Sequence, residues 1–374
     1  MKYIGPKVHI DLDRLENNYN LLSKDLQNIP IMATVKANAY GHGAVEVSKR
    51  LERLGVRYLA VFTIEEGIEL RKAGIKTDIF IYSKLNQTAL SEAKKYKLTL
   101  NISSFEDLNH LKDFQDESLK VHLKIDTGMT RLGVSHKKAE EFLNEVAKLD
   151  CIVIEGLYSH FATGDEGDLS YAKKQLNRFN SVVELSRKLN IHPSFVHCSN
   201  SGAILNLPES KFNLCRVGIL LYGAFPSDEV PQDLKIKPVM TFTAPVVEIR
   251  DVKAGTSISY GGVFTTEHDT RIAVIQAGFA DGVPRPWYSE GYVKFKNEKF
   301  KITGRVCMDQ LMVDLGSSNV SIGDEVLIFG SNSNGTISIN EIAKEIESTS
   351  YAIVTGIGTR PKKFLRSKLK PNQG

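Results

Sequence analysis

Residues 29–43 read IPIMATVKANAYGHG, an apolar run that ends in Lys36 and continues into a turn of small residues. The run has the length and composition of a strand. A lysine at the end of a buried strand enters a region of low dielectric, where its amine loses its proton readily and forms Schiff bases. A lone lysine at a strand end is more often a surface residue. The Tyr40-Gly-His-Gly43 segment favours a site, because glycines let the backbone approach a ligand closely.

Seven further runs resemble the first one and alternate with segments that predict amphipathic helices. Two such segments are 137–149, where apolar residues recur at i, i+4 and i+7, and 170–189, where they recur at i, i+3 and i+7. Eight strands with intervening helices fit a (β/α)8 barrel, although a doubly wound open sheet alternates in the same way. The eight runs are 29–36, 58–63, 78–82, 98–103, 119–125, 152–158, 194–199 and 212–217.

The pattern changes near residue 238, after which strand-like runs dominate and only 339–347 looks helical. We therefore predict an α/β fold with an N-terminal (β/α)8 TIM-type barrel over 1–238 and a mostly β C-terminal domain over 239–374. The early strand that begins at Val8 precedes the barrel pattern and is expected to pair with the second domain. The later strand-like runs are 239–249, 271–277, 292–302, 305–315 and 325–329.

The composition of the chain excludes several classes of protein. With 42% hydrophobic and 25% charged residues it is not a disordered chain. A formal net charge of +4 gives no case for nucleic acid or a membrane surface as a partner, and no apolar stretch reaches the ~18 residues of a membrane span. The four cysteines form no CxxC pair and the nine histidines no HExxH, so we expect no metal site and a cytoplasmic location.

Polar residues recur where the predicted strands end, which is where barrel enzymes place their chemistry. The Ser201 hydroxyl follows the seventh predicted strand, and the backbone N–H groups around Gly218 follow the eighth. In barrels, phosphate groups often bind at these two positions. Together with a lysine after the first strand, this hydroxyl and these N–H groups suggest pyridoxal phosphate as cofactor and a small molecule as substrate. The residues concerned are Lys36, Arg131, His160, His197, Ser201, Arg216, Gly218 and Ile219.

In this order, the motifs resemble those of the bacterial alanine racemase family, pyridoxal-phosphate enzymes of fold type III. The resemblance covers nearly the whole chain, and its most specific parts are the Lys36 and Cys-Met-Asp-Gln segments. The chain departs from the family at Phe279, where a tyrosine is usual, which leaves its substrate range open. The motifs are VKANAYGHG (35–43), KIDTGMTRLG (124–133), SHFATGD (159–165), HCSNS (197–201), RVGILLYG (216–223), SYG (259–261), GFADG (278–282) and GRVCMDQ (304–310), with Tyr351 near the end.

The resemblance implies a role for each matched residue. Lys36 would hold pyridoxal 5'-phosphate as a Schiff base and act as one catalytic base. Tyr260 would be the other base and would reach the active site of the partner subunit in a homodimer. Arg131 and Met308 would orient the substrate. The other cofactor-binding residues that the resemblance implies are Tyr40, His160, His197, Ser201, Arg216, Gly218, Ile219 and Tyr351.

The activity implied is that of an isomerase that interconverts L- and D-alanine by a two-base mechanism and supplies D-alanine for peptidoglycan and cell wall biogenesis. A serine or broad-spectrum racemase on the same scaffold is an alternative. A non-catalytic pyridoxal-phosphate-binding protein is a weaker one, because such proteins lack the segment 239–374. Lys124 matches a lysine often carbamylated in the family; a buried lysine neutralised by Asp126 is the other interpretation.

Overall fold

The computed structural model describes residues 3–112, 114 and 119–368. These residues fall into two compact units. The barrel unit comprises Asn18–Leu221 and Phe225–Lys235. The β-rich unit comprises the described residues of Met1–Asn17, Tyr222–Ala224 and Ile236–Gly374, so that helix α1 (Leu12–Asp25) begins in one unit and ends in the other.

Parallel strands form the barrel unit, and each coincides with one of the eight predicted runs. Hydrogen bonding runs in the orders β10-β2-β3-β4 and β5-β6-β8-β9. The two groups join where the Thr99 N–H donates to Ile79 O (2.8 Å), and where the Arg216 N–H donates to Ser199 O (3.2 Å). The strands therefore close on themselves, which confirms the barrel and excludes an open sheet. The strands are β2 (Ile31–Thr34), β3 (Tyr58–Val61), β4 (Asp78–Ile81), β5 (Leu100–Ile102), β6 (Leu119–Asp126), β8 (Ile152–Tyr158), β9 (Phe195–His197) and β10 (Cys215–Val217).

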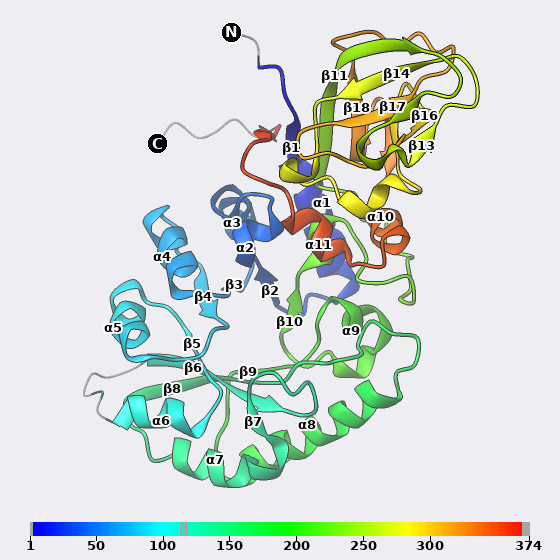
Figure 1. Cartoon of the computed structure of the whole chain (residues 1–374). Coiled ribbons are helices and arrows are strands. Elements are labelled where there is room, and N and C mark those ends of the chain that lie inside the picture. The colour runs from blue at the N-terminus through cyan, green and yellow to red at the C-terminus, as the bar shows by residue number, and fades with distance from the viewer. Residues whose placement is uncertain (1–2, 113, 115–118, 369–374) are drawn as a thin grey trace. The chain divides into compact units, whose positions relative to one another are not determined.

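Helices connect the strands, and Figure 1 shows α6, α7 and α8 along one side of β6, β8 and β9. Their apolar faces are buried; α8, for example, buries Leu176, Phe179 and Val183, the residues whose spacing predicts it. The short strand β7 (Val134–Ser135) adds to β6. The helices are α2 (Lys36–Tyr40), α3 (Ala44–Arg53), α4 (Ile64–Lys72), α5 (Gln87–Tyr96), α6 (Phe105–Lys112), α7 (Ala139–Val146), α8 (Ser170–Lys188) and α9 (Ser201–Asn206).

Aromatic rings and two histidines fill the interior of the barrel. Phe80 stacks on His122, with ring centroids 4.7 Å apart, and Tyr158 stacks on His197 at 4.9 Å. Gly156 on β8 makes room for His122, because a Cβ at residue 156 would lie 2.4 Å from the imidazole ring. The β6–β8 register shifts at this point. A glycine in the strand thus accommodates a polar ring inside the barrel.

Gly156→Ala should destabilise the protein by about 1–3 kcal/mol, because the new methyl group overlaps the His122 ring in a closely packed interior. The loss of backbone entropy in the unfolded chain favours alanine by only about 0.4–1 kcal/mol. Urea unfolding measures the difference. Val153→Ala is the control, because Val153 lies on the same strand and is 47% exposed. Equal stabilities for the two variants would contradict the predicted overlap.

The β-rich unit is built on a nine-stranded sheet of described residues in which β1 lies between β11 and β20. β1 pairs antiparallel with β11 and parallel with β20, so the predicted pairing of the segment from Val8 with this region is confirmed. The segment predicted as helical contains α10 (Ile339–Glu345), and α11 (Ser350–Thr355) follows it. The strands are β1 (Lys7–Asp11), β11 (Met240–Val252), β12 (Ser257–Ile258), β13 (Phe264–Thr265), β14 (Thr270–Ile275), β15 (Tyr292–Phe295), β16 (Glu298–Lys301), β17 (Leu311–Asp314), β18 (Glu325–Asn332), β19 (Gly335–Ile337) and β20 (Lys362–Arg366).

Two strand predictions in this unit are wrong in extent. Residues 292–302 form a hairpin, β15 and β16, because the chain reverses at Lys296 and Asn297, which have φ of 47° and 68°. Residues 305–310 form a loop, and the strand begins only with β17. The loop conformation is held by the carbonyl groups at its middle, which accept hydrogen bonds from the backbone of residues 279–280 instead of from a neighbouring strand.

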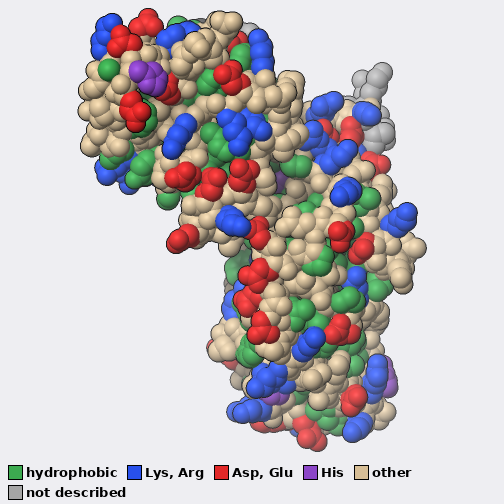
Figure 2. All heavy atoms as spheres, turned by 90° about the vertical axis from the view of Figure 1, so that its right-hand side faces the viewer, with side chains coloured by type: hydrophobic (Ala, Val, Ile, Leu, Met, Phe, Trp, Pro, Cys, Tyr) green, Lys and Arg blue, Asp and Glu red, His purple; other side chains and the backbone are tan. Residues whose placement is uncertain are grey.

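Among the residues that the structure describes, no helix is long and apolar enough to cross a membrane. The same residues contain no group of three or more His, Cys, Asp or Glu side chains that could hold a metal ion. Acidic and basic side chains are interspersed over the face shown in Figure 2.

Candidate active site

The turn that follows Lys36 is left-handed. Ala37, Asn38, Ala39 and Tyr40 all have φ between 50° and 54°. Residues other than glycine pay about 1–2 kcal/mol each for this conformation, so four in succession need compensating contacts. Asn38 supplies two of them: its Oδ1 accepts from the Ala44 N–H (2.8 Å), and its carbonyl accepts from the Gly43 N–H (2.9 Å).

Lys36 itself is half-buried, and its surroundings on balance disfavour its charge. Its Nζ lies 5.7 Å from the centroid of the Tyr82 ring. Burial lowers the pKa of Lys36, and the charge of Arg131 lowers it further, whereas Glu66 opposes both effects. The lysine after the first barrel strand is therefore closer to the neutral, nucleophilic state than a surface lysine.

A second buried lysine, Lys124 on β6, is only 6% exposed. Its Nζ lies 5.4 Å from the centroid of the Tyr158 ring. Burial, followed by the charges of Arg131 and Arg216, lowers the pKa of Lys124 to about 7, with Asp126 acting in the opposite direction. Arg131 is exposed on the loop after β6. The structure thus brings three cationic side chains predicted from sequence to one end of the barrel.

Arg216 on β10 is buried, at 3% exposure, and its partners are all neutral. Its guanidinium donates to the carbonyl groups of Ser159 (2.8 Å) and Cys198 (2.9 Å). It also lies 2.7 Å from His197 Nδ1 and 3.1 Å from His160 Nδ1. None of these partners is a carboxylate, so the charge of the arginine is not neutralised by its own hydrogen bonds.

These contacts determine where the neighbouring histidines carry their protons. A guanidinium can only donate, so Nδ1 of His197 must accept, and the proton of the ring lies on Nε2. That nitrogen is 2.9 Å from His122 Nδ1, which must accept in turn. Burial and the nearby Arg216 charge hold the pKa of His197 and His160 well below the usual value, and lower that of His122 to about 3. All three rings are therefore neutral: His197 and His160 accept hydrogen bonds from Arg216, and His122 accepts one from His197.

A small polar cradle lies beside the arginine. Ser201 begins α9, and its Oγ accepts from the Gly218 N–H at 3.1 Å. A Cβ at residue 218 would lie 2.9 Å from the Tyr40 hydroxyl, so only glycine leaves this space open. The adjoining Ile219 is fully buried. Hydroxyl and backbone N–H donors around a glycine suit a phosphate group, and Arg216 suits an acceptor nitrogen. The residues present therefore fit pyridoxal phosphate.

The β-rich unit brings Tyr260 and Met308 together around a hollow of about 510 Å³. Both are exposed, Tyr260 at 70% and Met308 at 55%. Ser259 and Cys307 also line this hollow, and the Ser259 hydroxyl donates to Arg305 O (2.6 Å). Two large apolar side chains exposed beside each other are typical of a surface that meets another molecule.

Arg360 braces the loop that carries Met308. Its Nε and one terminal nitrogen both lie 3.0 Å from the carboxylate of Asp281, and the other terminal nitrogen lies 2.6 Å from Asp309. Paired hydrogen bonds of this kind restrict orientation as well as distance. Phe279 lies two residues before Asp281 and is 40% exposed.

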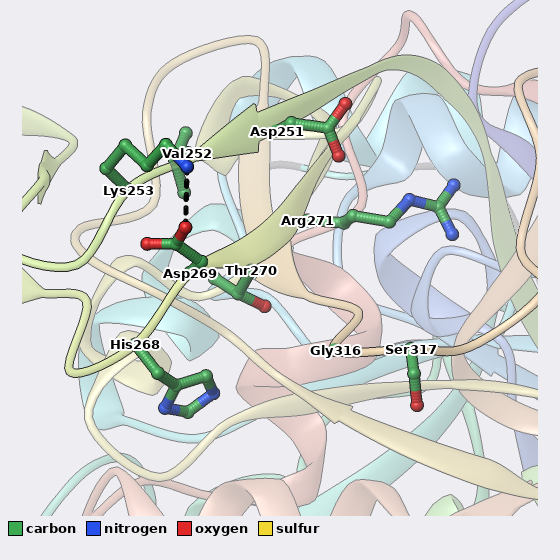
Figure 3. Close-up of a pocket in the computed structure, with 9 residues that line it drawn as sticks. All are labelled: Asp251, Val252, Lys253, His268, Asp269, Thr270, Arg271, Gly316 and Ser317. Carbon is green, nitrogen blue, oxygen red and sulfur yellow. Dashed lines mark hydrogen bonds and ion pairs between the residues drawn. The ribbon is translucent and has the colours of Figure 1, made fainter.

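Other features of the β-rich unit lie outside this hollow. Tyr351 is half-buried on α11 and does not line it. A separate hollow of about 670 Å³ lies where β11 ends and β14 begins (Figure 3). Its Lys253 pairs with Asp269 at 2.7 Å, and its Arg271 donates to the carbonyl groups of residues 318 and 320. Because Lys253 is paired with a carboxylate and the Arg271 guanidinium already donates to acceptors within the chain, we assign no ligand to this hollow.

Sequence reasoning missed two residues of the barrel site. Strand alternation puts His122 on the same face of β6 as Lys124, but its bond to His197 depends on a register shift that the sequence does not display. Glu66 was not singled out. The Thr63-x-x-Glu66 pattern marks it as part of a helix cap, but nothing in the pattern indicates its contact with the turn after Lys36.

The fold and the candidate site define the class of the protein: a (β/α)8 barrel with polar and charged side chains at the carboxyl ends of its strands, followed by a β-rich unit. The family model of the alanine racemase N-terminal domain matches residues 10–226, and that of the C-terminal domain matches residues 239–365. The alanine racemase of Halothermothrix orenii is 38% identical over 365 residues, which cover 96% of each chain.

Solved structures agree with these matches. An alanine racemase of Clostridium difficile 630 is 36% identical, with a TM-score of 0.90 over 98% of this chain and 97% of that one. The alanine racemase of a D-cycloserine-producing Streptomyces lavendulae is 31% identical, with a TM-score of 0.91 over 99% of each chain. The chain belongs to the alanine racemase family, whose members are isomerases.

The lowered pKa of Lys124 predicts how stability changes with pH. The folded pKa is about 7 and the unfolded value is 10.5, so between these values the unfolded chain binds more protons. Stability should therefore rise with pH in this window. Lys124→Met should lower the slope of unfolding free energy against pH by the contribution of up to one bound proton. Urea unfolding at several pH values, in buffer freed of carbon dioxide, measures this slope. An unchanged slope would contradict the assignment.

Proposed function

We propose that this chain interconverts L- and D-alanine with pyridoxal 5'-phosphate as cofactor and two catalytic bases. Membership of the alanine racemase family supports the substrate. The observation that carries the proposal is the arrangement in the barrel unit: a half-buried Lys36 of lowered pKa, an Arg216 with only neutral partners, and the cradle around Gly218. These are the groups that a phosphorylated pyridine aldehyde needs.

When bound, pyridoxal phosphate supplies a conjugated electron sink that stabilises the charge left when the α-proton of an amino acid is removed. Lys36 is the residue that would join its aldehyde, and Arg216 would face its ring nitrogen. The hydrogen bonds of His160 and His197 to Arg216 would keep the guanidinium in place. The phosphate would be held by Tyr40, Ser201, Gly218, Ile219 and Tyr351.

Arg216 also favours racemisation over other reactions of this cofactor. A guanidinium donates hydrogen bonds but keeps its protons at any physiological pH. An acceptor nitrogen that faces it is therefore hydrogen-bonded and stays unprotonated. A carboxylate in this position would instead favour a protonated ring and a stronger electron sink. The weaker sink suits a brief deprotonation followed by reprotonation of the same carbon.

Racemisation needs a proton removed from one face of the α-carbon and one returned to the other face. We assign the two faces to Lys36 and to Tyr260 of a second copy of the chain. For L-alanine, the phenolate of Tyr260 takes the α-proton and the Lys36 ammonium group donates one from the opposite side; D-alanine reverses the roles. Arg131, together with the backbone of Met308 from the second copy, would orient the substrate carboxylate and the cofactor hydroxyl.

The assignment implies a homodimer with shared active sites. Tyr260 and Met308 lie together on an exposed, partly apolar surface, which is the kind of surface that a partner covers. Each copy would thereby supply one base of its own and one to its partner. We further place the enzyme in the cytoplasm, where its D-alanine would serve peptidoglycan synthesis.

We propose that Lys124 can carry a carbamate. At a pKa of about 7 a substantial fraction of its amine is neutral at physiological pH, and the neutral amine can add to carbon dioxide and release a proton. The resulting anion would lie near the Arg131 charge and would hold that side chain for the substrate carboxylate. Carbon-13 NMR in labelled bicarbonate distinguishes a carbamate from a bare amine.

Purified protein with pyridoxal phosphate should convert L-alanine toward an equal mixture of the two enantiomers, as measured by chiral chromatography. Lys36→Ala should abolish the conversion, because it removes both the cofactor attachment and one base. L-serine is run alongside. If serine is converted faster than alanine, the protein is a serine or broad-spectrum racemase on the same scaffold. Bound cofactor without any D-product from either substrate would favour a non-catalytic binding protein.

Inactive Lys36→Ala and Tyr260→Phe proteins should regain activity when their subunits are exchanged. In a mixed dimer one site has both bases and the other has neither, so random exchange should restore about a quarter of the normal activity. Native mass spectrometry verifies the exchange. A mixture that contains mixed dimers but stays inactive would show that Tyr260 acts within its own chain.

A further inference from the structure

Glu66 connects two segments of the barrel unit through both of its carboxylate oxygens. Oε1 accepts a hydrogen bond of 2.6 Å from the N–H of Ala37, the first residue of the left-handed turn. Oε2 accepts from the N–H groups of Phe62 (2.8 Å) and Thr63 (3.2 Å), which lead from β3 into α4. One side chain thus ties the residue after Lys36 to the start of the next helix.

This arrangement exceeds what a helix cap requires. In a capping box the third residue of the helix accepts from the N-cap N–H, and glutamate and glutamine serve equally. Thr63 and Glu66 form such a box, in which the Thr63 hydroxyl accepts from the Glu66 N–H. Here the second oxygen is also in use. A glutamine has only one accepting oxygen, so it can hold either the cap or Ala37 but not both.

The turn needs such a contact at its beginning. Ala37 is the first of four residues in the strained left-handed conformation, and Asn38 stabilises only the later part of the turn. The Ala37 peptide directly follows Lys36, so its orientation determines the direction in which the lysine leaves the strand. Glu66 also faces Lys36 electrostatically and holds its pKa higher than burial and Arg131 alone would.

We propose that Glu66 is a positioning residue for Lys36: its carboxylate anchors the Ala37 peptide to the start of α4 and so directs the Lys36 amine into the site. The kinetic part of this proposal rests on the proposed function, whereas the anchoring part does not. Neither capping nor packing of α4 alone requires a carboxylate here, since a single accepting oxygen completes the cap.

Two variants separate anchoring from capping. Glu66→Gln leaves one accepting oxygen for two segments, whereas Thr63→Ala removes the cap hydroxyl and leaves both Glu66 oxygens in place. Hydrogen exchange of residues 36–44 is measured by mass spectrometry on the full-length protein, with and without pyridoxal phosphate. Glu66→Gln should raise hydrogen exchange at the Ala37 N–H about tenfold or more, because the substitution removes the acceptor of that N–H and so makes local opening easier. Thr63→Ala should leave exchange at Ala37 unchanged.

Steady-state kinetics on alanine supply the second measurement. A misdirected catalytic amine affects the proton-transfer step, so Glu66→Gln should lower kcat about tenfold or more while KM changes about twofold or less. Thr63→Ala should leave both constants within about twofold of the wild type. If Glu66→Gln matches Thr63→Ala in both exchange and kcat, the proposal is wrong.

The two proposals can fail separately. A wild-type protein that does not racemise alanine, but in which Glu66→Gln still exposes Ala37 to exchange, rejects the proposed function and retains the anchor. If Glu66→Gln alone is too unstable to purify, Ala37→Gly combined with it lowers the strain of the turn. Slow exchange at residue 37 in that double variant, equal to that in Thr63→Ala, would overturn the anchor.

Discussion

A permanent positive charge buried among neutral groups organises the barrel site. Arg216 cannot lose its proton, so each of its neighbours must present an acceptor. This requirement places the protons of His197 and His160 on Nε2, because Nδ1 of each ring accepts from Arg216. His197 Nε2 then donates to His122 Nδ1, so the protonation of His122 is determined as well. The same charge acts on Lys124 and helps keep it close to neutral. Without a carboxylate partner, the arginine keeps a positive charge that its own hydrogen bonds do not neutralise.

The lysine side of the site depends on a different constraint, which is backbone geometry. Four consecutive left-handed residues would not persist in an isolated peptide, and they persist here because contacts from outside the turn outweigh the strain. The β-rich unit shows the same use of bracing: Arg360 grips Asp281 and Asp309 and so holds the loop of Met308. In both units, ion pairs or charged acceptors immobilise the backbone next to a candidate functional residue.

Sequence reasoning predicted the barrel well because its strands are buried on both faces and read as continuous apolar runs. It also predicted which polar residues follow those strands, since strand ends of a barrel share one face. The strand prediction failed at 292–302 and 305–310, where polar and apolar residues keep alternating although the chain reverses in the first segment and forms a loop in the second. Hydrogen bonds to residues distant in sequence hold both of these conformations. The contacts of Glu66 and His122 were missed for the same reason: each depends on the register of neighbouring strands.

The pairing of β1 with β11 and β20 has a consequence for synthesis on the ribosome. The first strand of the chain has partners that are made late, and the hydrogen bond from the Lys368 N–H to the Asp13 carboxylate spans 355 residues. Residues of the barrel unit can begin to pack as they emerge, since their neighbours are close in sequence. One edge of the nascent β1 must instead wait for β11 (Met240–Val252), and the other must wait for β20 (Lys362–Arg366). Its sequence, Lys-Val-His-Ile-Asp, alternates polar with apolar residues, and charged side chains on an unpaired strand disfavour association with other chains.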